Sequence, residues 1–513
     1  MDRLRLLWLR GSARLLFGSL AALVLSAWVA AASAAAFAPV ISEFAAPANP
    51  YQPNPWSIAA AGGKLWFSDQ SNNVVDGFDP STHAFGPTLI PWFEPDDMSI
   101  GSDGNAWFTD EGHPSSAVGV VDATNSTVHE YSSGLNPGSY LSGISAGSDG
   151  NVWFTDFGTT SAIGVINPDT HAIHEYSAGL NGGSHPLRIT AAPDGNLWFT
   201  DQSSTTPAIG QINPITHAVH EYWAGLEPGS APRGIAVGAD GNVWFTDSGS
   251  TPAIGEINPT THTITEYTAG LTGSRLNGIA AGPDGNLWFA DERGALGEIN
   301  PTTHDITEYT TGLNSGSDPI WFTSGPDASM WFTDGAGYIG QVTTGATSTT
   351  RSLTVSVNGS GHVTSSSTGI SCPGSCTHSF AFGVPVALTA EAPSGYTFAG
   401  WSGPCSGAGK CTAMMFGPSD VSAKFTLLKP HGTKITKATV KKRAHRATFK
   451  FRAGGVVTGF QCALVKKHHK PSFKSCRSAK TYKHLKSGHY TFEVRAVNSS
   501  GADPRLATKK FTI

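Results

Sequence analysis

Seven copies of one hydrophobic pattern occupy residues 38–345 of this chain. Each copy contains an apolar run, an Asp-Gly turn, the sequence Trp-Phe-x-Asp, and two further segments of the types A-I-G-x-I-N and I-x-E-Y. Apolar and polar residues alternate in these segments, which predicts four short β-strands per copy. A repeat of about 40–45 residues with four strands is typical of propeller blades. We therefore predict an all-β fold that begins with a seven-bladed β-propeller, its blades marked by Trp66, Trp107, Trp153, Trp198, Trp244, Trp288 and Trp331.

The two ends of the propeller segment are predicted to share one blade. The last copy contains three strands, ending at residues 338–342, and no I-x-E-Y strand follows it. Ile41-Ser42-Glu43-Phe44 matches the missing strand at the other end of the segment. Pairing of residues 41–44 with 338–342 would remove two open sheet edges, which are sites of aggregation.

Residues 1–36 have the composition of a secretory signal peptide. Arginines at positions 3, 5, 10 and 14 precede an apolar stretch, and the small residues 32–36 supply a cleavage site. No later apolar stretch reads as a membrane span. The pattern predicts a secreted, extracellular or cell-surface protein, with an uncleaved membrane anchor as the alternative.

All six cysteines follow residue 370. This agrees with folding in an oxidising compartment. The spacing favours local disulfides, and a zinc site is the alternative, although the C-x3-C and C-x5-C spacings differ from the usual zinc knuckle. The predicted pairs are Cys372–Cys376, Cys405–Cys411 and Cys462–Cys476.

Two small modules follow the propeller. Residues 346–428 contain G-S-G-H-V-T-S, F-A-G-W-S-G and a final V-x-A-x-F, and they resemble the divergent InlB B-repeat modules of exported bacterial proteins. Residues 430–513 alternate through H-Y-T-F-E-V-R-A-V-N and resemble a fibronectin-type or immunoglobulin-like sandwich. The resemblance implies that both modules act as spacers or adhesive stalks.

Acidic and basic residues are concentrated in different parts of the chain, although its net charge is only −5. Residues 35–345 carry 33 Asp and Glu against five Lys and Arg, whereas residues from 429 onward carry 21 Lys and Arg against Glu493 and Asp503. The field of the basic module attracts polyanions over a Debye length of roughly 8 Å. An anionic cell-wall polymer or another anionic surface is the expected partner. Nucleic acid is not, because no stacking aromatics lie between the lysines. The alternative is a solvated module that keeps the protein soluble.

An Asp stands three residues after each of the seven Trp residues. Seven carboxylates near one face could form a ring that holds Ca²⁺ or Mg²⁺. A residue present in every copy is more simply explained as a cap that bonds its own loop, and we favour that explanation. The positions are Asp69, Asp110, Asp156, Asp201, Asp247, Asp291 and Asp334.

The propeller segment resembles the virginiamycin B lyase, or streptogramin lyase, family in its repeated G-P-D-G-N-L-W-F, I-G-x-I-N and E-Y segments. This resemblance implies magnesium-dependent opening of a cyclic depsipeptide by elimination. It places a histidine two residues before the first-strand isoleucine in each of two late blades, a Glu before the last Pro-His pair, and a Glu four residues after a Trp.

None of the residues counted at the histidine position is a histidine here. They are Trp56, Met98, Ser142, Leu187, Arg233, Asn277 and Ile320. Arginine stays protonated and asparagine has no proton to exchange at neutral pH. Acidic partners remain, because Asp318 takes the place of the first Glu, and Glu292 and Glu111 stand four residues after a Trp. A lyase or hydrolase of altered chemistry would use Glu292, Asp318, Glu111 and His185, with a weak metal site at Glu292 and Asp318.

The copies differ most at two loop positions that share one face of a propeller. Four residues before the isoleucine we count Asn54, Asp96, Tyr140, His185, Ala231, Arg275 and Asp318. Four residues after the Trp stand Gln70, Glu111, Phe157, Gln202, Ser248, Glu292 and Gly335. The strands repeat almost unchanged, whereas these loop positions hold different polar, charged and aromatic residues. This contrast favours a ligand-binding groove over neutral variation of exposed loops.

The predicted ligand-binding rim is Trp56, Asp96, Tyr140, His185, Arg233, Arg275 and Asn277. We expect an exported, monomeric protein whose propeller binds a small molecule, glycan or peptide, with Mg²⁺ or Ca²⁺ as the conceivable cofactor. A lyase or hydrolase is one alternative, and a structural or adhesion protein is another.

Overall fold

The computed structural model describes residues 38–48, 50–90, 94–112, 116–122, 125–203, 205–273, 275–346 and 350–513. The predicted signal segment 1–36 lies outside these residues. Within the described part of the chain, no helix is long and apolar enough to cross a membrane.

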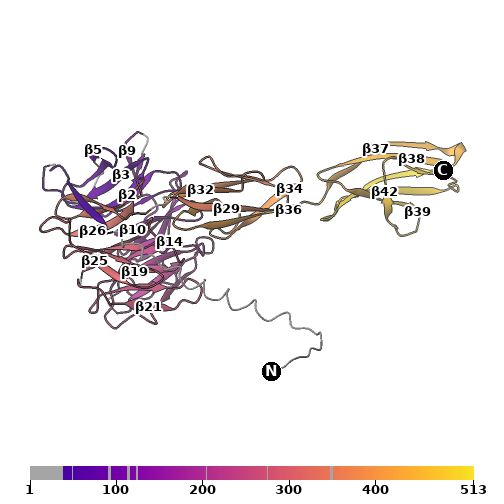
Figure 1. Ribbon diagram of the computed structural model, residues 1–513. Coiled ribbons are helices and arrows are strands. Elements are labelled where there is room, and N and C mark those ends of the chain that lie inside the picture. Colours follow the sequence, from indigo (N-terminus) through magenta and orange to yellow (C-terminus); the bar gives the residue numbers. More distant parts are fainter. Residues whose placement is uncertain are drawn as a thin grey trace, which may run out of the picture. The chain divides into compact units, whose positions relative to one another are not determined.

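Seven four-stranded antiparallel sheets form the propeller, and neighbouring sheets follow one another in chain order (Figure 1). The first three blades are β2 (Pro55–Ala61), β3 (Lys64–Asp69), β4 (Val74–Asp79) and β5 (Ala84–Leu89); β6 (Pro95–Ile100), β7 (Ala106–Asp110), β8 (Ala117–Asp122) and β9 (Thr127–Tyr131); and β10 (Leu141–Ala146), β11 (Val152–Asp156), β12 (Ala162–Ile166) and β13 (Ile173–Tyr176).

The next three blades have the same order of strands. They are β14 (Pro186–Ala191), β15 (Leu197–Asp201), β16 (Ala208–Ile212) and β17 (Val219–Tyr222); β18 (Pro232–Val237), β19 (Val243–Asp247), β20 (Ala253–Ile257) and β21 (Ile264–Tyr267); and β22 (Leu276–Ala281), β23 (Leu287–Asp291), β24 (Ala295–Ile299) and β25 (Ile306–Tyr309).

The seventh blade joins the two ends of the propeller, as predicted. It contains β26 (Pro319–Ser324), β27 (Met330–Asp334), β28 (Tyr338–Thr343) and β1 (Val40–Ala45). β1 pairs antiparallel with β28, and Ile41 lies opposite Val342. Ile41 is buried against Trp288 of the preceding blade. The closure prediction is therefore confirmed.

The repeated Trp-Phe pair explains why the blades stack. Both side chains are buried in every blade, and clusters of buried residues combine a Trp of one blade with the Phe of the next. The glycine of the third strand makes room for the Phe ring, because a Cβ on Gly164 would overlap Phe154. The indole Nε1 of Trp153 donates to Asp149 at 3.1 Å, so the Asp-Gly turn also satisfies the buried donor.

Histidines in the turns before four of the fourth strands help to join neighbouring blades. His171, His217, His262 and His304 adopt positive φ in the turns before the fourth strands. Each stacks on the tyrosine of the preceding blade, with ring centroids 4.1–4.3 Å apart.

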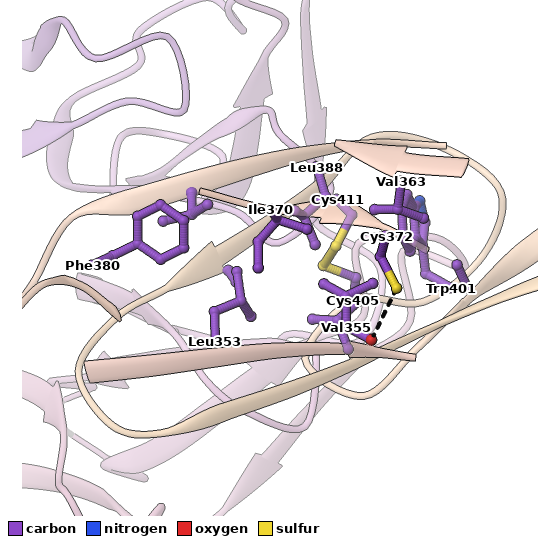
Figure 2. Close-up of a cluster of buried hydrophobic side chains, with 14 of the residues drawn as sticks. Leu353, Val355, Val363, Ile370, Cys372, Phe380, Leu388, Trp401, Cys405 and Cys411 are labelled. Atoms are coloured by element: carbon purple, nitrogen blue, oxygen red, sulfur yellow. Dashed lines mark hydrogen bonds between the residues drawn. A yellow bond between two sulfur atoms is a disulfide. The ribbon is translucent and has the colours of Figure 1, made fainter. Parts of the chain in front are cut away.

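The second module contains two sheets around one core. The first sheet is β32 (Thr377–Ala381), β29 (Thr350–Asn358), β36 (Ser419–Leu427) and β34 (Tyr396–Ser402); the second is β31 (Ser371–Cys372), β30 (His362–Ser365), β33 (Pro385–Glu391) and β35 (Cys411–Met414). Figure 2 shows the Cys405–Cys411 disulfide among the apolar side chains of this core, near Val355 and Ile370.

The third module is a sandwich of two sheets. One is β37 (His431–Lys441), β38 (Arg446–Gly454) and β41 (Lys480–Tyr482), with a short 3-10 turn at Lys442–Ala444. The other contains β40 (Lys474–Cys476), β39 (Gly459–Lys466), β42 (His489–Asn498) and β43 (Gly501–Ala502), with β44 (Ala507–Thr512) on β42. Phe449 and Phe492 of the two sheets stack at 4.1 Å. All three predicted disulfides are present: Cys372–Cys376, Cys405–Cys411 and Cys462–Cys476.

Candidate functional site

The variable loop positions meet in a cavity of about 380 Å³ at one face of the propeller. We call it the rim cavity. Its lining comes from the starts of the first strands and from the residues that follow the second strands. The lining residues are Trp56, Gln70, Asp96, Glu111, Ser142, Phe157, Leu187, Arg188, Gln202, Ala231, Arg233, Ser248 and Asn277.

A bulge in every first strand places these side chains. The register shifts between the first residue of the strand and the apolar residue three positions later, as between Leu141 and Ile144. The bulge therefore turns the intervening residues toward the axis and the cavity.

In the second blade this register corrects our sequence count. Met98, and not Ile100, lies opposite Phe108, the Phe of the Trp-Phe pair in this blade. In the third blade, for example, the residue opposite the corresponding Phe is the first-strand isoleucine, Ile144. The residue two positions earlier is therefore Asp96, and Glu94 occupies the outer position. Met98 is a buried core residue outside the lining. The sequence pattern assigned Ile100 to the isoleucine position because an isoleucine occupies that position in most other blades.

The aspartates after each Trp brace the loops of the rim cavity. Asp156 accepts hydrogen bonds from the backbone N–H groups of Tyr140 at 2.8 Å and Gly158 at 2.7 Å. Equivalent pairs of bonds recur at Asp69, Asp110, Asp201, Asp247 and Asp334. These bonds show the loop-capping role that we favoured for six of the seven aspartates.

The floor of the cavity is a buried ion cluster that sequence reasoning missed. Arg188 Nη1 donates to Asp96 Oδ2 at 2.9 Å, and Asp97 lies on its other side with Oδ2 3.9 Å from Nε. The Arg188 guanidinium also lies over the ring of Trp321 at 4.9 Å. Arg188 is only 6% exposed. Burial raises the pKa of Asp97, and Arg188 opposes that shift.

Glu292 joins two arginines and an amide at one side of the cavity. Its Oε1 accepts from Arg233 Nη1 at 3.0 Å and from Asn277 Nδ2 at 2.7 Å. Its Oε2 lies 2.7 Å from Arg275 Nη2. Both oxygens of this carboxylate are therefore engaged by donors, and two cations surround it.

Glu111 lies on another side of the cavity, beside Tyr140. The Tyr140 hydroxyl donates to Glu111 Oε2 at 2.9 Å. Burial and the nearby Asp96 raise the pKa of Glu111 to about 8. A carboxyl group with a raised pKa can donate a proton or a hydrogen bond into the cavity while it is protonated.

An aromatic row extends the rim next to Glu111. Phe157 lines the cavity and packs against Tyr140 and His185, with ring centroids 4.6 Å and 4.2 Å away. Burial lowers the pKa of His185, which favours the neutral imidazole. Tyr140 and His185 thus pack against a lining residue but do not line the cavity themselves. Arg275 does not line the cavity either, and it contacts Glu292 beside the cavity.

Two polar atoms of described residues in the lining are buried without a hydrogen-bond partner, the indole Nε1 of Trp56 and Nε of Arg188. Oδ1 of Asp318, which lies outside the lining, is buried in the same way. Burial and the neighbouring Glu292 raise the pKa of Asp318. An unsatisfied donor in the lining of a cavity is costly without a ligand or water.

The residues at Glu292 and Asp318 do not fit a Mg²⁺ or Ca²⁺ site. Such cations need several oxygen ligands with free lone pairs, whereas both Glu292 oxygens already accept from cationic or amide donors. Arg233 and Arg275 would also repel a divalent cation. Across the described ranges, no group of three or more His, Cys, Asp or Glu side chains could hold a metal.

Comparisons with known proteins agree with the fold. Residues 351–429 match the model of the divergent InlB B-repeat domain. No curated protein matches the chain. A solved structure described as a streptogramin B lyase is 28% identical with a TM-score of 0.52, covering 60% of this chain and 97% of that one. Virginiamycin B lyase from Staphylococcus aureus is 27% identical with a TM-score of 0.53, covering 60% of this chain and 99% of that one.

The model of the virginiamycin B lyase family matches residues 39–225 and 208–368. These ranges span the whole propeller and more than half of the chain. Together with the seven closed blades, they confirm the resemblance carried by the Trp-Phe-x-Asp repeats. The chain belongs to the virginiamycin B lyase family.

Proposed function

We propose that this protein is exported and that its propeller binds a small molecule, peptide or glycan in the rim cavity. In this proposal the protein does not carry out the magnesium-dependent elimination that the family resemblance implies. The three disulfides support export, because such bonds persist in oxidising compartments.

The cluster around Glu292 is the observation that carries the proposal. Elimination needs a base that takes a proton from the substrate, and the family resemblance implies a magnesium ion that stabilises the developing charge. Arg233 and Asn277 offer neither, and their donors engage Glu292 directly. The arrangement suits recognition of polar groups better than proton transfer.

The lining indicates the chemistry of the ligand. Arg233 supplies positive charge on one side, and Glu111 in its protonated form supplies a hydrogen-bond donor on another. Phe157 and Leu187 add apolar surface, and Trp56 Nε1 offers an unused donor. A ligand with carboxylate, carbonyl or hydroxyl acceptors and an apolar part, such as a peptide or glycan, meets all of these groups.

The test is a thermal-shift screen of the full chain against short peptides and oligosaccharides, followed by calorimetry. A ligand at about 100 times its Kd stabilises a protein by about 2.7 kcal/mol, so Tm should rise. Gln202→Ala, in the lining, should abolish the rise. Gln211→Ala, in the third strand of the same blade and outside the lining, should preserve it. Equal effects of both variants, or no ligand in either class, would overturn the proposal.

A second candidate function rests on Glu111. A carboxyl group with a pKa of about 8, hydrogen bonded by Tyr140 at the edge of a cavity, resembles a general acid. The chain would then be a hydrolase or lyase of altered chemistry. Turnover of ester or glycoside substrates that declines above about pH 8 and is lost in Glu111→Gln would support this function. Turnover that survives Glu111→Gln would exclude it.

A further inference from the structure

One face of the terminal sandwich carries opposed cationic side chains. β37 and β38 lie side by side near the C-terminus (Figure 1). Residues directly opposite in an antiparallel pair project to the same face. The three opposed pairs, which we call the cation ladder, are Lys434 and Arg452, Lys437 and Lys450, and Lys441 and Arg446.

The cation ladder lies on the outer face of its sheet. The alternate residues of β38, among them Phe449 and Phe451, are buried in the core between the two sheets. Five of the six cationic residues are exposed and Arg446 is half-buried. The turn that joins the two strands adds Lys442 and Arg443, both exposed, at the end of the ladder.

In the described part of the chain, no carboxylate forms an ion pair with the cation ladder. Among the described residues, the ion pairs involve only Arg188, Arg233, Arg275 and Lys410 as cations. Of the two acidic residues of the module, Glu493 is on β42 of the other sheet. Asp503 accepts hydrogen bonds from Thr433, a buried residue of β37 that projects to the opposite face from the exposed Lys434. Like charges directly opposite one another destabilise a sheet. Without an anion, this arrangement therefore opposes folding of the module.

The other side chains of this face restrict the partner. Between the cationic pairs lie Thr439 and Thr448, and Thr481 of β41 continues the row. The face has no aromatic side chain to stack on nucleobases or to insert at a bilayer interface. Along β38 the charges of Lys450 and Arg452 lie about 7 Å apart, and those of Arg446 and Lys450 about 13 Å apart because Thr448 stands between them. Across the two strands the paired charges lie about 5 Å apart. That spacing suits an extended chain of anionic groups.

We infer that the cation ladder is a docking surface for a linear polyanion, a cell-envelope polymer that carries phosphate in each repeat unit. Lysine ammonium and arginine guanidinium groups bind phosphate through charge-assisted hydrogen bonds. The polymer would neutralise the opposed pairs and release its counterions. This inference does not depend on the ligand of the rim cavity.

The experiment compares three forms of the full chain in binding to inorganic polyphosphate across a salt series. The first is the unmodified protein. The second carries Lys437→Ser and Lys450→Ser, which remove the central pair of the ladder. The third carries Lys467→Ser and Lys470→Ser, which remove the same charge from the exposed loop after β39. Vesicles of phosphatidylcholine and phosphatidylglycerol, and duplex DNA, serve as competing polyanionic surfaces.

The unmodified protein should bind polyphosphate at low salt and release it as salt rises. The ladder variant should lose affinity at least tenfold, and its log–log salt slope should fall by about 1.4 if each contact contributes about 0.7. The loop variant should stay within about twofold of the unmodified protein, since its lysines lie outside the ladder. Calorimetry should show a higher Tm for the ladder variant, because a repulsive pair has been removed. A higher Tm would show that the ladder variant is folded, so that its weaker binding would come from the missing lysines.

Three results would overturn the inference. They are equal loss of binding in the two variants, absence of polyphosphate binding at low salt, and tighter binding of the vesicles or DNA than of polyphosphate. The first would show that polyphosphate binding depends only on the net charge of the module. The last would identify a membrane or nucleic acid as the partner.

Discussion

Arg188 illustrates what single residues contribute to this site. It is one of five cationic side chains in residues 35–345, and it stands one position before a first-strand isoleucine. Blades three and five hold glycine there, at Gly143 and Gly234. An arginine in an acidic domain, at a position that holds glycine in several other blades, was a visible signal. The sequence could not show that Asp96 and Asp97, about 90 residues earlier, meet it across the axis.

Replacing Arg188 by Met should strongly destabilise the propeller. The change leaves Asp96 and Asp97 buried without their cation, and breaking a buried pair from one side costs about 3–5 kcal/mol. Chemical denaturation of the full chain measures the loss. The matched control is Arg275→Ala, because Arg275 also pairs with a carboxylate but its side chain is 62% exposed. The control should cost less than about 1 kcal/mol. Equal losses would contradict the role assigned to burial.

At the scale of strands and blades, sequence periodicity predicted most of the structure. The Trp-Phe-x-Asp repeats gave the number of blades because each repeat has a fixed role in stacking. The closing strand could be recognised because Ile41–Phe44 keeps the I-x-E-Y pattern. Five of the seven positions that stand four residues after a Trp line the rim cavity, among them Phe157 and Gln202, which the predicted ligand-binding rim did not include. Contacts between blades could not be predicted, because they depend on how side chains from different repeats meet at the axis.

Removal of the closing strand should destabilise the ring. Deletion of residues 38–46 exposes the edge of β28 and uncovers Trp288, so stability should fall by several kcal/mol or the protein should aggregate. Two point variants separate the effect of burying a β1 side chain from the effect of shortening the chain. Ile41→Ala should cost about 2–5 kcal/mol, whereas Val40→Ala, at a residue 58% exposed, should stay within about 0.5 kcal/mol. An unchanged Tm after the deletion would refute closure by β1.

Repeated carboxyl pairs should make the propeller less stable as pH rises. Burial and the neighbouring Asp156 raise the pKa of Glu175 to about 8. The equivalent environments raise the pKa of Glu43, Glu221 and Glu266 to about 7. The folded state then holds protons that the unfolded state releases above its ordinary glutamate pKa of 4.5. Stability is therefore fully present below that pKa and is lost as pH rises through 7 to 8.

Thermal unfolding at several pH values tests this behaviour. Tm should fall by several degrees between about pH 5 and about pH 8.5. The variant Glu175→Gln, Glu221→Gln, Glu266→Gln should show a flatter profile, while Glu391→Gln, at an exposed position in β33, should keep the original slope. A Tm that rises with pH across this range would show that the pairs do not share a proton.

At the scale of the whole molecule, the chain combines an acidic family propeller with a strongly basic terminal sandwich. The two parts differ in surface chemistry: the propeller has a cavity with mixed polar and aromatic groups, and the sandwich has an open face of lysines and arginines. The family assignment fixes the scaffold, whereas function depends on side chains that vary between blades. We propose that the cluster of Arg233, Arg275, Asn277 and Glu292 separates this chain from the reaction that the family resemblance implies.

The most direct test of that departure is incubation of the purified full chain with a type B streptogramin, with and without added Mg²⁺. Mass spectrometry then measures formation of the linear product. Because Arg233 and Asn277 supply no base and Glu292 is engaged by three donors, we expect linearisation no faster than in buffer under either condition. Magnesium-dependent linearisation that disappears in Glu292→Gln would contradict the account.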